Sequence, residues 1–221
     1  MAASSGGAGP GATSASKTIM LGGAAKIAAV LLVLAGCGMN GNYRDTDVPM
    51  ESVARLDTER YAGLYHELYH LLKAADPACR VAIAGVSQPT PLRLAYLERV
   101  LDAYRGRYGE PMPVDVWNIH LAILREERGS WGVGIPPGLP DDSGILYEIE
   151  DNADVEILKE QVVTFRRWMA ERGLRDKPLI VTEFSVLMPP EYGFPFEVVR
   201  DFMLDAADYL MTASDGGLGY P

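Results

Sequence analysis

The stretch Lys177-Pro178-Leu179-Ile180-Val181-Thr182-Glu183-Phe184 decides the fold class of this chain. Its apolar run, with two β-branched residues behind a proline, predicts a buried strand of a parallel sheet. Glu183 then stands at the carboxyl end of that strand, where parallel α/β proteins build their sites. A carboxylate there must face water in a cleft or be paired, so a structural salt bridge and a functional role both stay open.

The segments around this strand alternate between helical and strand patterns. Helices are expected over residues 58–75, 91–108, 155–172 and 196–212, and strands over 80–86, 114–120 and 179–184. Strict alternation predicts parallel strands joined by right-handed crossovers, as in a (β/α) barrel or an open sheet. Side chains alternate along a strand, so Glu183 should share a face with Val181 and Thr182 should point to the opposite one.

The overall composition excludes some classes of function. The chain has 221 residues, 48% of them hydrophobic, and a net charge of -10. Nucleic-acid binding needs clustered Lys and Arg, which the sequence does not contain. The two cysteines cannot form a disulfide framework. The length predicts one or two domains.

The N-terminal 37 residues have the pattern of an export signal. Lys17 and Lys26 precede the apolar run Ile27 to Leu34, and small residues lead to Cys37. The run is too short to span a membrane, and its end resembles the lipoprotein box of bacteria, which implies lipidation of Cys37 and extracytoplasmic, membrane-anchored protein. We therefore expect a leader over 1–37, a flexible tether over 38–57 and a folded domain over 58–221.

His66-Glu67-Leu68-Tyr69-His70 matches the H-E-x-x-H pattern of zinc hydrolases. On a helical wheel, however, both histidines point away from the apolar stripe of their helix, whereas zinc ligands lie in a cleft. The pattern favours a solvated outer face, and a zinc hydrolase is the most distant alternative.

Polar residues also end the strand 114–120. Asn118 and His120 share one face at its carboxyl end, the same end of the sheet as Glu183. The long segment 121–153 that follows carries Trp131, and an exposed aromatic ring there can stack on a sugar or cover a small core of its own.

The strands Val114-Asp115-Val116-Trp117-Asn118-Ile119-His120 and Pro178-Leu179-Ile180-Val181-Thr182-Glu183-Phe184 resemble strands six and seven of retaining TIM-barrel glycoside hydrolases with two catalytic glutamates. Arg80-Val81-Ala82-Ile83 resembles strand five. The resemblance implies a partial (β/α)8 barrel over 58–221, with Glu183 as nucleophile and with His120 and Asn118 lining the sugar subsite. The place of Trp131 in the loop at the same end makes it a further candidate for sugar binding. It implies a carbohydrate substrate and neither cofactor nor metal.

The chain departs from that family in one respect. The family's acid/base glutamate follows an asparagine at the end of strand four, and no Asn-Glu pair occurs here. A complete barrel has about 250 residues. We therefore expect a C-terminal part with little turnover, completed by a missing N-terminal barrel half. The main alternative is a surface lipoprotein that binds carbohydrate without cleaving it.

Overall fold

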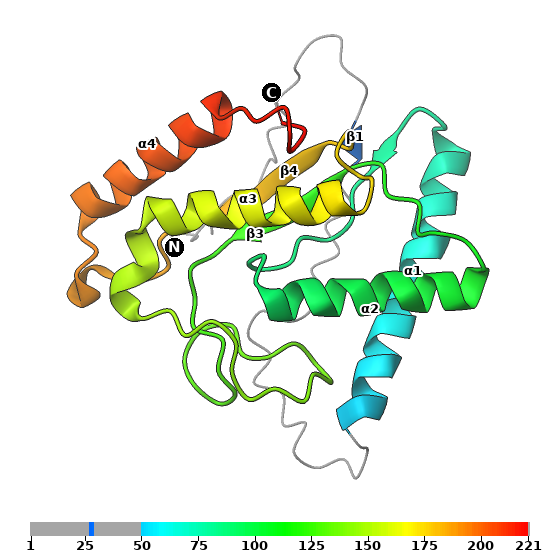
Figure 1. Cartoon of the computed structure of the whole chain (residues 1–221), viewed down its shortest axis with the longest axis horizontal. Coiled ribbons are helices and arrows are strands. Elements are labelled where there is room, and N and C mark those ends of the chain that lie inside the picture. The colour runs from blue at the N-terminus through cyan, green and yellow to red at the C-terminus, as the bar shows by residue number, and fades with distance from the viewer. Residues whose placement is uncertain (1–26, 29–49, 221) are drawn as a thin grey trace, which may run out of the picture.

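A computed structural model of the chain describes residues 27–28 and 50–220, and it shows a mixed α/β protein (Figure 1). Helices and strands alternate as expected along most of the chain. In chain order the elements are β1 (Ile27–Ala28), α1 (Met50–Ala75), β2 (Arg80–Val81), α2 (Pro91–Tyr108), β3 (Trp117–Leu121), η2 (Ile149–Ala153), α3 (Val155–Glu171), β4 (Leu179–Phe184), η3 (Pro190–Tyr192) and α4 (Phe196–Thr212).

The strands form a small parallel sheet, which confirms the predicted strand direction. β3 pairs with β4, and β1 pairs with β2. The chain beyond β2 joins β3 through parallel bridges from Ala82 to Val116 and from Val86 to Ile119. Within the described residues the sheet is open and no barrel closes. β4 is therefore an edge strand, and its side chains are half-buried where a fully buried strand was expected.

The core lies where helices cover the sheet. In Figure 1, α3 crosses in front of β3 and β4, and α4 lies beside α3. The ring of Trp117 on β3 lies 5.2 Å from that of Trp168 and 6.2 Å from that of Phe165, both on α3. All three side chains are buried. These aromatic contacts fix α3 on the sheet and so place the loops at both of its ends.

The helices begin and end at residues whose chemistry stops a helix. α2 starts with Pro91, whose missing N–H is not needed in the first turn, and ends at Gly109 with φ +74°. The Asp154 carboxylate accepts the backbone N–H groups of Glu156 and Ile157 and so caps α3. These signals explain why the predicted helix boundaries of α2 and α3 agree with the structure to within one residue.

α1 differs from the prediction in its start and in its buried face. It begins at Met50, so residues 50–57 of the expected tether are helical. His66, expected on a solvated face, packs against α2: its ring stacks on Tyr108 at 3.8 Å, and its Nδ1 lies 2.8 Å from the Tyr104 hydroxyl. Leu71, expected in the buried stripe, is 65% exposed. Tyr61 and Tyr65 of the expected stripe are buried, and α1 in addition packs His66 against the rings of α2.

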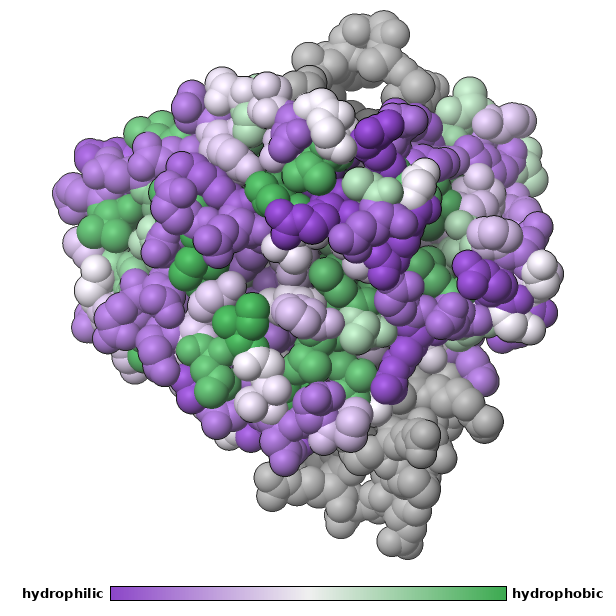
Figure 2. All heavy atoms as spheres, viewed as in Figure 1, coloured by the Kyte–Doolittle hydropathy of each residue, from purple (hydrophilic) through white to green (hydrophobic). Residues whose placement is uncertain are grey.

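The leader, Cys37 and tether residues 38–49 lie outside the described residues, apart from Ile27 and Ala28 in β1. In the part of the chain that is described, no helix has the length and apolar character needed to cross a membrane. Figure 2 shows hydrophilic residues over most of one face of the molecule. The exposed hydrophobic residues include four on α4: Phe196, Val198, Leu204 and Met211.

Candidate functional site

Polar side chains meet at the carboxyl ends of β3 and β4. The sheet register sets His120 opposite Glu183, and Asn118 lies two residues earlier on β3. Because the strands are parallel, their carboxyl ends meet at one edge of the sheet. The structure thus brings together three of the four predicted site residues in the described part of the chain: Asn118, His120 and Glu183.

A β-bulge changes which side chains face this site. The register shifts between Ile119 and His120, so β4 carries one extra residue at Thr182. Thr182 donates its hydroxyl to Asn118 Oδ1 at 2.9 Å, and the next residue, Glu183, reaches His120. Strict alternation predicted that Thr182 and Glu183 face opposite sides, and this was wrong. Bulges turn a side chain in this way and are frequent beside active sites.

The pair His120–Glu183 is the centre of the site. His120 Nδ1 lies 3.4 Å from Glu183 Oε2, and the side chains are 16% and 58% exposed. Burial lowers the pKa of His120, and the nearby Glu183 carboxylate only partly opposes that shift. The imidazole is therefore neutral at pH 7. Its Nδ1 faces the Glu183 carboxylate, and more than half of the Glu183 side chain is exposed to solvent.

Gly85 makes room for this arrangement. A β-carbon built on Gly85 would lie 2.6 Å from His120 Cδ2, 2.8 Å from His120 Nε2 and 3.2 Å from Asn118 Nδ2. No side chain fits there, so the histidine ring and the asparagine amide lie directly over the glycine backbone. Gly85 was not predicted as a site residue, although a glycine inside a strand pattern signals a close approach.

The long segment after β3 is held by buried polar groups. Gln88 Nε2 donates to the carbonyl of Leu124, and Gln88 Oε1 accepts the N–H of the same residue. The fully buried Glu126 accepts hydrogen bonds from Thr90 Oγ1 at 2.7 Å and Arg93 Nε at 3.0 Å. These bonds give Glu126 a structural role that the sequence pattern did not reveal.

Trp131 lies in the same segment and is half-buried. None of the contacts found among the described residues joins it to His120 or Glu183. The predicted sugar-binding role of Trp131 therefore stays a prediction.

A second buried amide ties the loops at this end of the sheet together. Asn152, on η2, is 1% exposed. Its Nδ2 donates to the carbonyl of Ile123 beyond β3 at 2.7 Å, and its Oδ1 accepts the N–H of Leu187 beyond β4 at 3.1 Å. Asn152 therefore fixes both loops and η2 relative to the strands that carry His120 and Glu183.

The H-E-x-x-H segment shows no metal-binding geometry. His66 Nδ1 is engaged with Tyr104, while His70 is exposed and meets His66 edge-on, with ring centroids 4.3 Å apart. In the described ranges, no cluster of three His, Cys, Asp or Glu side chains could hold a metal ion.

Comparison with family profiles, with curated proteins and with solved structures gave no match for this chain.

Proposed function

We propose that Glu183 is the catalytic nucleophile of a retaining glycoside hydrolase site, in a sheet that is part of a (β/α)8 barrel. The observation that carries the proposal is the contact of the largely exposed Glu183 with His120, 3.4 Å apart, at the carboxyl ends of two paired parallel strands. β2, β3 and β4 would correspond to strands five, six and seven of that barrel.

The geometry suits the first half of a double displacement. A Glu183 oxygen attacks the anomeric carbon of a sugar, a carbon–oxygen bond forms, and the aglycone oxygen leaves with a proton supplied by a second carboxyl group. Water then cleaves the glycosyl ester and regenerates the carboxylate. Neutral His120 supports this role because it can orient the carboxylate without adding a positive charge that would weaken the nucleophile.

Asn118 supports the proposal from the next position on β3. Thr182 donates to its Oδ1, which fixes the amide and leaves Nδ2 as a donor beside the His120 ring. A fixed amide donor near a nucleophile can bind a sugar hydroxyl, and such hydrogen bonds strengthen in the transition state.

The second carboxyl group should lie about 5 to 5.5 Å from the first in a retaining enzyme. Glu126 does not suit that role, because it is fully buried and bonded to Arg93 and Thr90. We therefore do not assign the role of the acid/base carboxyl group to any residue of the described sheet.

The open edge of β4 supports the barrel part of the proposal. β4 is half-buried, and the apolar residues Phe196, Leu204 and Met211 on α4 are 72%, 62% and 78% exposed. A further strand and helix of a barrel would pair with β4 and cover these side chains.

The test uses 2,4-dinitrophenyl glycosides of several neutral sugars, because this leaving group departs without a proton from the enzyme. The expected result is release of dinitrophenol that falls by a factor of about 10³ or more in Glu183→Gln, since the covalent route is lost. Glu191→Gln is the matched control, because Glu191 is an exposed glutamate of η3 in the loop that follows β4. Equal rates in the parent protein and Glu183→Gln would refute the assignment.

A further inference from the structure

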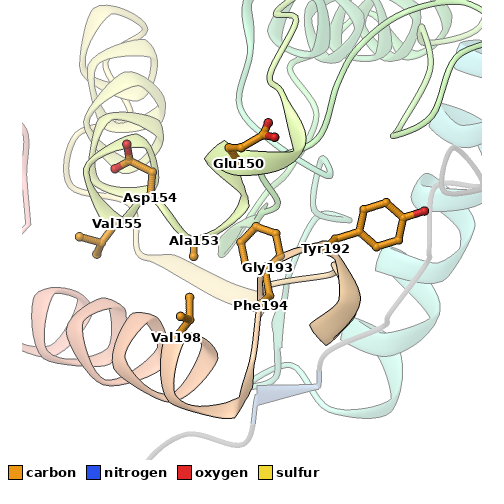
Figure 3. Close-up of a pocket in the computed structure, with 8 residues that line it drawn as sticks. All are labelled: Glu150, Ala153, Asp154, Val155, Tyr192, Gly193, Phe194 and Val198. Carbon is orange, nitrogen blue, oxygen red and sulfur yellow. The ribbon is translucent and has the colours of Figure 1, made fainter.

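A hollow of about 540 Å³ opens between η2, the first residues of α3, and the loop that leads from η3 into α4 (Figure 3). It is separate from the His120–Glu183 pair, since neither residue lines it. Its size falls within the range of small-molecule sites, about 300–1,000 Å³.

The hollow belongs to the same end of the sheet as Glu183. It is lined by η2 and by the chain that follows β4, and Asn152 bonds both of these to the loop that follows β3. The walls of the hollow are thus tied to the loops that follow the two strands carrying His120 and Glu183.

The chemistry of the lining divides into an apolar interior and a polar rim. Ala153, Val155 and Val198 present aliphatic groups to it, and Phe194, only 5% exposed, is its buried aromatic residue. Tyr192 stands on the rim with 55% of its surface exposed. In Figure 3 the Tyr192 ring projects from the rim instead of filling the interior. An exposed aromatic ring at the edge of an apolar hollow can stack on the C–H face of a pyranose.

The charge of the rim narrows the class of ligand. Glu150 and Asp154 are both exposed, Asp154 Oδ1 accepts the N–H groups of Glu156 and Ile157, and the Glu150 carboxylate is a further acceptor for a hydroxyl at the rim. Two carboxylates at the rim of a protein with net charge -10 disfavour an anionic ligand. Neutral sugars fit these groups and uronic acids do not.

We infer that this hollow is a second sugar-binding subsite, which takes a neutral pyranose of the same glycan that Glu183 attacks. Tyr192 provides the stacking surface, and the Glu150 carboxylate accepts a sugar hydroxyl. The inference rests on the proposed function for its ligand class, carbohydrate.

Binding is measured on the full chain carrying Glu183→Gln, so that no ligand is cleaved during the titration. Neutral gluco-, manno-, xylo- and galacto-hexaoses are the probes, and hexagalacturonate is the charged comparison. Calorimetry should show binding of at least one neutral hexaose and weaker binding of the uronate. Adding Tyr192→Ala should lower the affinity for the neutral sugar by about five- to tenfold, which is the contribution of one aromatic contact. Phe196→Ala, which removes another exposed aromatic ring outside the hollow, should leave the affinity unchanged.

The outcomes separate this inference from the proposed function. Absence of binding, equal affinity with and without Tyr192, or a preference for the uronate overturns the subsite, whereas Glu183-dependent turnover can persist in each case. Binding that depends on Tyr192 in a protein without Glu183-dependent turnover supports the subsite and refutes the catalytic role. The chain would then be the carbohydrate-binding protein of the alternative hypothesis.

Discussion

Replacing Gly85 by alanine tests whether this glycine exists to admit the His120 ring. The new methyl group would lie 2.6 Å from His120 Cδ2, whereas ordinary contacts start at 3.4 Å. The ring must therefore move by about 0.8 Å if the backbone stays in place. His120 Nδ1 is already 3.4 Å from Glu183 Oε2, so a shift of this size is enough to separate the pair.

The expected cost to stability follows from two opposing effects. Overpacking of this kind costs about 1–3 kcal/mol, and replacing a glycine in extended chain, here between the bridges of Ala82 and Val86, returns about 0.5–1 kcal/mol, which leaves a net loss of up to about 2.5 kcal/mol. Displacement of the ring toward solvent also weakens the burial that lowers its pKa, and this larger effect should outweigh the loss of the opposing contribution from Glu183, so the pKa of His120 should rise toward its ordinary value of about 6.5.

NMR titration of the His120 ring carbons measures that pKa, and urea unfolding measures the stability. Gly106→Ala is the control, because Gly106 lies in α2 and a β-carbon built there meets nothing within 4 Å. It should raise stability by up to about 1 kcal/mol and leave the His120 titration unchanged. A Gly85→Ala protein with an unaltered His120 pKa and unaltered stability would contradict the packing argument.

Three further predictions concern the buried ion pair, the pH dependence and the leader. Glu126→Ala should lower the free energy of unfolding in urea by about 3–5 kcal/mol, because it removes the buried carboxylate to which Arg93 and Thr90 are bonded. Glu127→Ala, at the partly exposed pair with Arg125, should have a much smaller effect, and equal losses would contradict the structural role of Glu126. Because the pKa of His120 is lowered on folding, the folded protein gains stability above about pH 6.5, and this stability is lost as the pH falls. His120→Gln should therefore lose less stability than the parent protein between about pH 7.5 and 5.5. Parallel pH profiles of the two proteins would contradict a lowered pKa of His120. In a bacterial host, Cys37→Ser should abolish incorporation of labelled palmitate, and undiminished labelling would exclude Cys37 as the lipidated residue.

The sequence predicts much of the local structure. The prediction of β4 is confirmed, because a short β-branched run after Pro178 suits a strand. The prediction of α2 is confirmed as well, because Pro91 and Gly109 mark its ends. The shared location of Asn118, His120 and Glu183 follows from the parallel strand order, which alternation alone predicts.

The features that were missed depend on partners far away in the chain. The bulge at Thr182 arises from the pairing of β4 with β3, and no pattern within either strand specifies a register shift. The packing of His66 depends on the rings of Tyr104 and Tyr108 on α2, and a helical wheel drawn from α1 alone cannot reveal these partners. The half-burial of β4 depends on what lies next to its open edge, which its own sequence does not encode.

The most direct test of the nucleophile is a covalent trap. A 2,4-dinitrophenyl 2-deoxy-2-fluoroglycoside reacts with the nucleophile of a retaining enzyme without help from an acid, and the fluorine slows hydrolysis of the glycosyl-enzyme that forms. We predict that the intact protein gains the mass of one fluoroglycosyl group and that peptide mapping places it on Glu183, with no adduct in Glu183→Gln. Labelling of another residue, or no labelling by any neutral sugar of the panel, would contradict the account.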